Sequence, residues 1–244
     1  MEPRASSSLH RHLPDPTRIE PTLAAVQRAW EGQPELSLPT LFAQLANEGI
    51  SWGSSDEQLV AALNQRAAVR PGHFPLADAP STARFLFSCG QARITVDGEW
   101  VVVRTPGRQP VVWRYARVRP TGPGRPLVVA DTEGFEHRFG VIDSITRIDP
   151  DGEVVRRGLQ GLKRSHLGDV AWVLRLDDNR VAICGHTLRV FTVHRREVSV
   201  QELRWERVLH GGALGEELAL AQPGGRQVTI GTVTGLWLAD APAG

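Results

Sequence analysis

A stretch rich in proline and glycine interrupts the chain at residues 70–81 and separates two kinds of hydrophobic pattern. Before it, apolar residues recur every three or four positions, as on a helix; after it they alternate, as on a strand. We therefore expect an α+β chain, with a small three-helix domain followed by a larger antiparallel β-rich domain. The predicted division is a flexible tail at residues 1–16, a helical domain at 17–70, a linker at 71–83, a first β-unit at 84–155, a connector at 156–169 and a second β-unit at 170–244.

The first helix is expected to begin at a capping box formed by Thr17 and Glu20. Its apolar face consists of residues with helical spacing, namely Ile19, Leu23, Val26 and Trp30. We expect this face to be buried, with Trp30 closing it as an anchor of the core.

Two further helices follow at short intervals. The second begins near Pro39, which suits a first turn, and ends at Gly49. The third begins at a serine cap with an acid or amide three residues later, which is either Ser54 with Glu57 or Ser55 with Gln58.

The spacing of leucines in this region matches a known arrangement of three short helices; these residues are Leu38, Leu41, Leu45, Leu59 and Leu63. In this pattern residues 17–70 resemble the winged-helix and helix-turn-helix superfamily, and the resemblance implies a recognition helix at residues 55–66. That helix would present Asp56 and Glu57 at its N-terminal end, where they would repel phosphates. The resemblance therefore transfers no DNA-reading residues to this chain.

Beyond the break, strands separated by Gly and Pro turns predict an antiparallel sandwich or barrel. Asp97 and Gly98 form a strong hairpin signal between strands at residues 94–96 and 100–103. Further strands are expected at residues 111–118, 127–130, 139–142, 170–176, 180–183, 188–193, 198–208, 218–220, 228–233 and 236–238.

The β-rich region also shows an internal repeat at an offset of 91 residues. Leu127, Ala130, Gly134 and Gly140 match Leu218, Ala221, Gly225 and Gly231, and Gly124 matches Gly215. The matches predict two degenerate copies of one β-unit, consistent with a small PH-like or SH3-like barrel. Glycine-rich turns that match by chance are the alternative explanation.

Positive charge is concentrated in two segments, although the formal net charge of the chain is only +1. Residues 84–125 hold eight Arg and two acidic residues, and the candidate contact residues there are Arg114, Arg117 and Arg119. The connector adds Arg156, Arg157, Lys163 and Arg164, among leucines. Such a segment is typical of a nucleic-acid, acidic-partner or membrane-surface contact, or of a connector with a solvated charged face, which we favour.

The sequence offers little that would support catalysis. Cys89 and Cys184 are expected to be buried thiols, and no nucleophile motif or phosphate-binding loop is visible. Cys184, His186 and His194 are the nearest approach to a metal site, but a fourth ligand is missing. We therefore predict no catalytic residue, no metal and no cofactor.

The function favoured by these patterns is that of a non-enzymatic cytoplasmic protein that binds or regulates a protein partner. A cytoplasmic location is expected because residues 1–12 contain no apolar signal run, and no stretch of the chain is apolar enough to span a membrane. The alternative is a nucleic-acid-associated regulator that uses the winged-helix-like domain and the basic β-domain surface.

Overall fold

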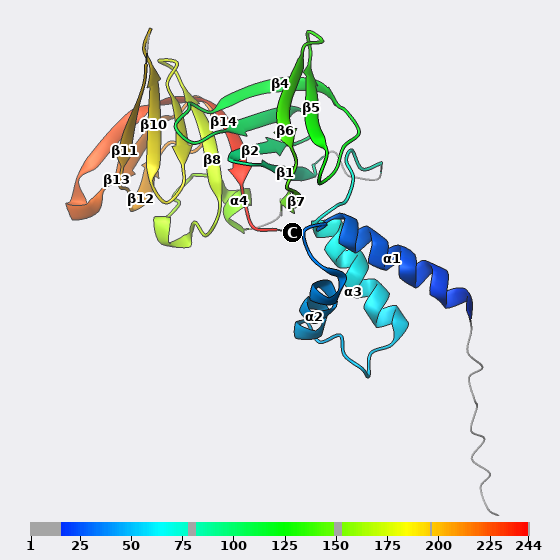
Figure 1. Ribbon diagram of the computed structural model, residues 1–244. Coiled ribbons are helices and arrows are strands. Elements are labelled where there is room, and N and C mark those ends of the chain that lie inside the picture. Colours follow the sequence, from blue (N-terminus) through cyan, green and yellow to red (C-terminus); the bar gives the residue numbers. More distant parts are fainter. Residues whose placement is uncertain (1–15, 78–81, 149–152, 196, 244) are drawn as a thin grey trace, which may run out of the picture.

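A computed structural model describes residues 16–77, 82–148, 153–195 and 197–243. Three helices come first, and two antiparallel β-sheets follow (Figure 1), which confirms the α+β class and the order of its parts. The helices in the described part of the chain are too short and too polar to cross a membrane. Residues 1–15 of the predicted tail lie outside the described residues.

The helices are α1 (Ile19–Glu31), α2 (Leu38–Asn47) and α3 (Asp56–Val69). The capping box of α3 is confirmed for Ser55 and Gln58, whose side chains each accept a hydrogen bond from the other residue's backbone N–H. The box predicted for Thr17 and Glu20 is wrong. A 3-10 turn, η1 (Pro16–Arg18), precedes α1, so Arg18 is the N-cap residue, and its side chain makes no capping bond.

The predicted buried face of α1 is also wrong. The buried residues are Ala25 and Ala29, whereas Ile19, Leu23 and Trp30 are 54%, 63% and 38% exposed. Sequence spacing shows which residues share a face, but it does not show which face meets the core. Here the small alanines face inward and allow a neighbouring helix to approach closely.

That neighbour is α3, which lies beside α1 and runs in the same direction. Arg18 pairs with Asp56 at the start of both helices, and Arg28 Nη2 donates to Asn64 Oδ1 at 3.0 Å further along. The core between the helices consists of Ala25, Ala29, Leu41, Leu45 and Leu63.

The first sheet contains β1 (Arg84–Cys89), β2 (Ala92–Val96), β3 (Trp100–Arg104), β4 (Val111–Val118), β5 (Pro126–Asp131), β6 (Glu136–Val141) and β7 (Ser144–Ile148). Its strand order is β6-β5-β4-β3-β2-β1-β7. The predicted hairpin is confirmed, because Asp97 Oδ1 accepts bonds from the backbone of Glu99 and Trp100 in the turn between β2 and β3. Two strands, β1 and β7, lie outside the predicted strands.

The second sheet contains β8 (Ala171–Leu176), β9 (Val181–Cys184), β10 (Leu188–Val193), β11 (Val198–Leu203), β12 (Arg207–His210), β13 (Glu217–Ala221) and β14 (Gln227–Asp240). Its order is β11-β10-β9-β8-β14-β13-β12. The strand predicted at 198–208 is instead two strands, because the chain turns to bury Trp205, whose Nε1 donates to the Gly185 carbonyl at 2.8 Å. Conversely, the two strands predicted at 228–233 and 236–238 form the single strand β14.

In both sheets the strands form an incomplete ring in chain order, but the gap in the ring lies at a different place in each sheet. Consecutive strands are neighbours in each, and the first strand of each sheet pairs with the last: β1 with β7, and β8 with β14. The ring is interrupted between β6 and β7 in the first sheet and between β11 and β12 in the second.

Equivalent backbone hydrogen bonds recur at the offset found in the sequence. Gly124 N donates to Ile142 O and Gly215 N to Val233 O, both at 2.8 Å, while Ile142 N donates to Arg125 O and Val233 N to Glu216 O, both at 2.9 Å. These bonds make β5 and β6 equivalent to β13 and β14. In chain order β5 and β6 are the fifth and sixth strands of their sheet, whereas β13 and β14 are the sixth and seventh strands of theirs. Duplication of one β-unit therefore stays a prediction, with this shared meander in its favour.

Part of the predicted linker packs against the first sheet. Phe74 is buried, with its ring edge-on to Phe85 and Phe87 at centroid distances of 5.2 and 5.0 Å. Its backbone also exchanges two hydrogen bonds with Thr121. Residues 78–81 lie outside the described residues. The helical domain is thus attached to the first sheet by packed chain, and the domain boundary at 71–83 stays a prediction.

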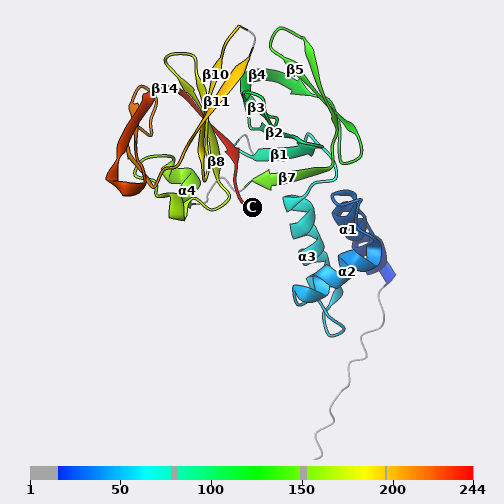
Figure 2. The same cartoon turned by 60° about the vertical axis from the view of Figure 1, so that its left-hand side comes forward.

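The two sheets meet where the C-terminal end of β14 reaches β2 and β3 (Figure 2). The Ala239 carbonyl accepts hydrogen bonds from Thr95 Oγ1 and from Arg104 Nη2, the latter at 2.7 Å. Arg104 also pairs with Asp240 at 3.0 Å. The apolar part of the contact includes Val102, Val173, Val181 and Ala239, and Ile148 of β7 packs into the core of the second sheet. Polar and apolar contacts together join the sheets into one body.

The position of α1 predicts unequal effects of two substitutions on stability. Leu63→Ala should lower the free energy of unfolding of the helical domain by about 2 to 5 kcal/mol, because it leaves a cavity in the core. Trp30→Ala should cost clearly less, because the indole is partly in water. Urea unfolding followed by far-ultraviolet circular dichroism measures both. An equal or larger loss of unfolding free energy for Trp30→Ala would contradict this expectation and would support the buried face predicted from the sequence.

Candidate functional site

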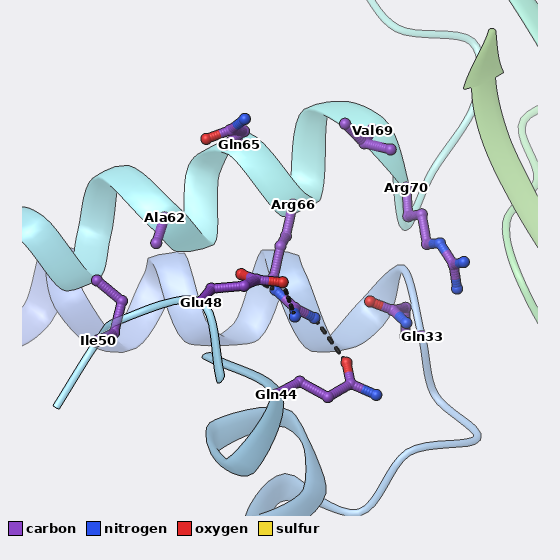
Figure 3. A pocket seen from close by; sticks show the side chains of 9 residues that line it. All are labelled: Gln33, Gln44, Glu48, Ile50, Ala62, Gln65, Arg66, Val69 and Arg70. Atoms are coloured by element: carbon purple, nitrogen blue, oxygen red, sulfur yellow. Dashed lines mark hydrogen bonds and ion pairs between the residues drawn. The ribbon is translucent and has the colours of Figure 1, made fainter. Parts of the chain in front are cut away.

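A groove of about 550 Å³ lies in the helical domain between α2 and α3, with the α1–α2 loop at one end (Figure 3). It is lined by Gln33, Gln44, Glu48, Ile50, Ala62, Gln65, Arg66, Val69 and Arg70. Its size falls within the range of surface sites that accept small ligands or the side chains of a partner protein.

Arg66 lies at the centre of this groove, and each nitrogen of its guanidinium donates a hydrogen bond. It donates to both carboxylate oxygens of Glu48, at 2.5 and 3.2 Å, and to Gln44 Oε1 at 2.8 Å. Its side chain is only 15% exposed. A paired, bidentate arginine of this kind fixes the geometry between α2 and α3. It therefore shapes the wall of the groove and does not supply a free charge.

The remaining lining separates into two ends. Ile50 and Ala62 lie at one end of the view, and Val69 and Arg70 at the other (Figure 3). The apolar side chains give contact area, and the polar groups near the rim offer hydrogen bonds. The groove therefore combines apolar surface with fixed polar groups, as protein-binding surfaces do.

Exposed large apolar side chains surround this domain. Besides the α1 residues, Phe42 on α2 is 40% exposed and Trp52, in the loop between α2 and α3, is fully exposed. Trp52 is not part of the hydrophobic spacing that predicts the helices. The signal that would have identified it is its place in a turn between Gly49 and Gly53, where an aromatic side chain has no core to enter.

The three candidate arginines of β4 and its continuation are all paired with acids. Arg114 Nη2 lies 2.8 Å from Glu99 Oε1. The guanidinium of Arg119 donates to both carboxylate oxygens of Glu136. Oε1 of the same carboxylate lies 3.5 Å from Arg117 Nη2. Exposed pairs of this kind add little to stability, but two acids offset most of the charge that the three arginines would present to phosphates.

The connector residues lie elsewhere, over the second sheet. The segment forms α4 (Glu153–Arg157) and the 3-10 turn η2 (Arg164–His166). Leu159, Leu162 and Leu167 enter the second core, while Arg156, Arg157, Lys163 and Arg164 are exposed. The described part of the connector thus has a buried apolar side and an exposed basic side, and its role as a connector stays a prediction.

The cysteine and histidine candidates do not form one site. Both thiols are buried, as predicted, and desolvation raises the pKa of Cys89 to about 11 and that of Cys184 to about 12. Cys184 pairs with Leu188 at one end of the β9–β10 hairpin, whereas His194 follows the other end of β10 and contacts Ser199. Among residues in the described ranges, no cluster of three His, Cys, Asp or Glu is placed to hold a metal.

Comparison with protein-family models, curated proteins and solved structures found no match. The functional argument therefore rests on the geometry of this chain. Two features stand out in the described residues: the exposed apolar side chains of the helical domain and the pairing of the β4 arginines.

The pairing of these arginines predicts weak, salt-sensitive binding to nucleic acid. Fluorescence anisotropy with random duplex and single-stranded DNA should show binding only at low salt, because the β4 arginines are paired with acids. Glu136→Gln should strengthen this low-salt binding, since it releases Arg117 and Arg119. Glu133→Gln, an equal change of charge in the adjoining turn, is the control and should have a smaller effect.

Tight binding that survives physiological salt and weakens on charge reversal at Arg114, Arg117 and Arg119 would contradict this prediction. It would show that the exposed pairs open readily and that these arginines meet phosphates.

Proposed function

We propose that this chain is a non-enzymatic binding or regulatory protein that acts through protein–protein contacts of its helical domain. The observation that supports the proposal is Trp52, a tryptophan with its whole side chain in water. It contributes no packing to the fold, and tryptophan is among the residues most enriched at the energetic centres of protein interfaces. Leu23 and Ile19 on α1 add exposed aliphatic area in the same domain.

The charge of this domain indicates the chemistry of the partner. Residues 16–70 contain six acidic residues and four arginines. Two of the arginines, Arg18 and Arg66, are already paired with Asp56 and Glu48. The partner that suits this surface therefore presents apolar side chains flanked by Lys or Arg.

One observation favours the alternative, a nucleic-acid-associated regulator. The backbones of Lys163 in the connector and Arg207 in β12 form an isolated β-bridge, and both side chains are exposed. Arg164, the next residue after Lys163, is exposed as well. This small basic surface lies on the β-domain and contains none of the β4 arginines. The protein-partner proposal and the nucleic-acid alternative thus involve different residues, so one experiment can separate them.

The test is capture of partners by the immobilised full chain from a nuclease-treated extract of the native cells, quantified by mass spectrometry. Leu23→Ser and Trp52→Ser should each reduce recovery of specific partners by about tenfold, as expected for loss of a central apolar contact. Phe135→Ser removes an exposed aromatic from the β5–β6 turn and serves as the matched control.

Recovery that is unchanged by Leu23→Ser and Trp52→Ser would contradict the helical surface as the docking site. Recovery that nuclease treatment abolishes, or that depends on Lys163 and Arg164 instead, would favour the nucleic-acid alternative.

A further inference from the structure

A second cavity, of about 390 Å³, lies between the two sheets. On one side are β2, the end of β3 and the β3–β4 turn; on the other are β9, β10 and β11. Four arginines reach it from these elements, namely Arg93, Arg104, Arg108 and Arg189. No spacing in the sequence brings them together, because they come from three strands and a turn of two different sheets.

Two of these arginines are placed directly opposite each other. Arg93 on β2 faces Arg104 on β3 in the register of the hairpin. Like charges at such positions repel and are unfavourable unless something neutralises them. The Arg93 side chain donates to the backbone carbonyls of Gly90 and Ala92, which carry no net charge. Asp240 pairs with Arg104, whereas the contacts of Arg93 within the described residues include no acidic side chain, so an anion in the cavity would offset the charge of Arg93.

Arg104 supplies a second, independent observation. Its side chain is 15% exposed, and Nη2 is occupied by the Ala239 carbonyl and by Asp240. Its Nε is buried and has no hydrogen-bond partner among the described residues. Buried donors are nearly always satisfied in folded proteins, so an unpaired one marks a place where an acceptor fits.

The rest of the lining specifies the shape of the acceptor. Glu202 is the one acidic side chain among the described lining residues, and it faces Arg189 across the β10–β11 pair. Ile183, Phe191 and Val200 form an apolar wall. Guanidinium groups match the oxygens of carboxylates and phosphates in a two-pronged geometry, and an apolar wall suits a hydrocarbon body. The concave shape favours a small molecule over a macromolecule.

We propose that this inter-sheet cavity binds a small organic anion that carries a carboxylate or phosphate group on a compact apolar body. The arginines hold the anionic group, and the wall of Ile183, Phe191 and Val200 contacts the body. Binding at this position touches both sheets at once, so it strengthens their contact. The site is separate from the helical surface and does not depend on the function proposed above.

Isothermal titration calorimetry of the full chain with phenyl phosphate, benzoate and inorganic phosphate tests the proposal. At least one aromatic probe should bind at one site per chain and more tightly than inorganic phosphate, because only it reaches the apolar wall. Phenyl phosphate and benzoate differ only in the anionic group, so the tighter of the two identifies that group.

The double variant Arg108→Gln and Arg189→Gln should weaken this binding by about tenfold or more, as loss of charge-assisted hydrogen bonds predicts. Both side chains are exposed, so the fold should be retained, which circular dichroism checks. Arg207→Gln removes an exposed arginine outside the cavity and should bind as the wild type does. Absence of saturable binding by both aromatic probes, or an equal loss in Arg207→Gln, would overturn the proposal.

Discussion

The contact between Arg104 and the end of β14 is the constraint on which the arrangement of the β-domain depends. Each sheet is an incomplete ring, and the described strands of one do not pair with those of the other along their length, although Ile148 of β7 packs into the core of the second sheet. Arg104 crosses this gap to the Ala239 carbonyl and to Asp240, and Thr95 bonds the same carbonyl. The inter-sheet cavity takes one wall from each sheet, so its shape depends on how the sheets are held together.

A ladder of aromatic and guanidinium groups supports the same contact. The rings of Trp100 and Trp237 lie 5.4 Å apart across the two sheets, with Arg114 over the first ring and Arg175 over the second. Cation–π contacts of this kind contribute about 0.5 to 1 kcal/mol when exposed. Arg114 therefore has a structural role, although its sequence context suggests a phosphate contact. Conversely, Arg104, which lines the cavity, has a buried Nε with no hydrogen-bond partner among the described residues.

Local signals predicted part of the local structure. The turn at Asp97 was predicted from neighbouring residues alone, and the α3 capping box was one of two alternatives that the pattern offered, whereas the box predicted at Thr17 and Glu20 was wrong. The buried face of α1 was mispredicted, because the close contact with α3 is made by two alanines, which are less hydrophobic than the aliphatic and aromatic residues of the predicted face. The inter-sheet arginines could not be predicted, since only the packing of two sheets brings them to one cavity. The groove likewise depends on how helices pack, which leaves no mark in a linear motif.

Hydrogen exchange measured by mass spectrometry on wild type and Arg104→Gln tests most directly whether this contact joins the sheets. Because Arg104 lies on β3 and its acceptors on β14, the variant should lower the opening free energy of amides in both sheets. Arg180→Gln is the control, since Arg180 pairs with Asp178 and donates to the Ile230 carbonyl within the second sheet alone. Loss of protection in both sheets for Arg104→Gln, and in the second only for Arg180→Gln, is the predicted result. Loss confined to the first sheet in Arg104→Gln would show that the sheets are stable independently and would contradict the single joined body.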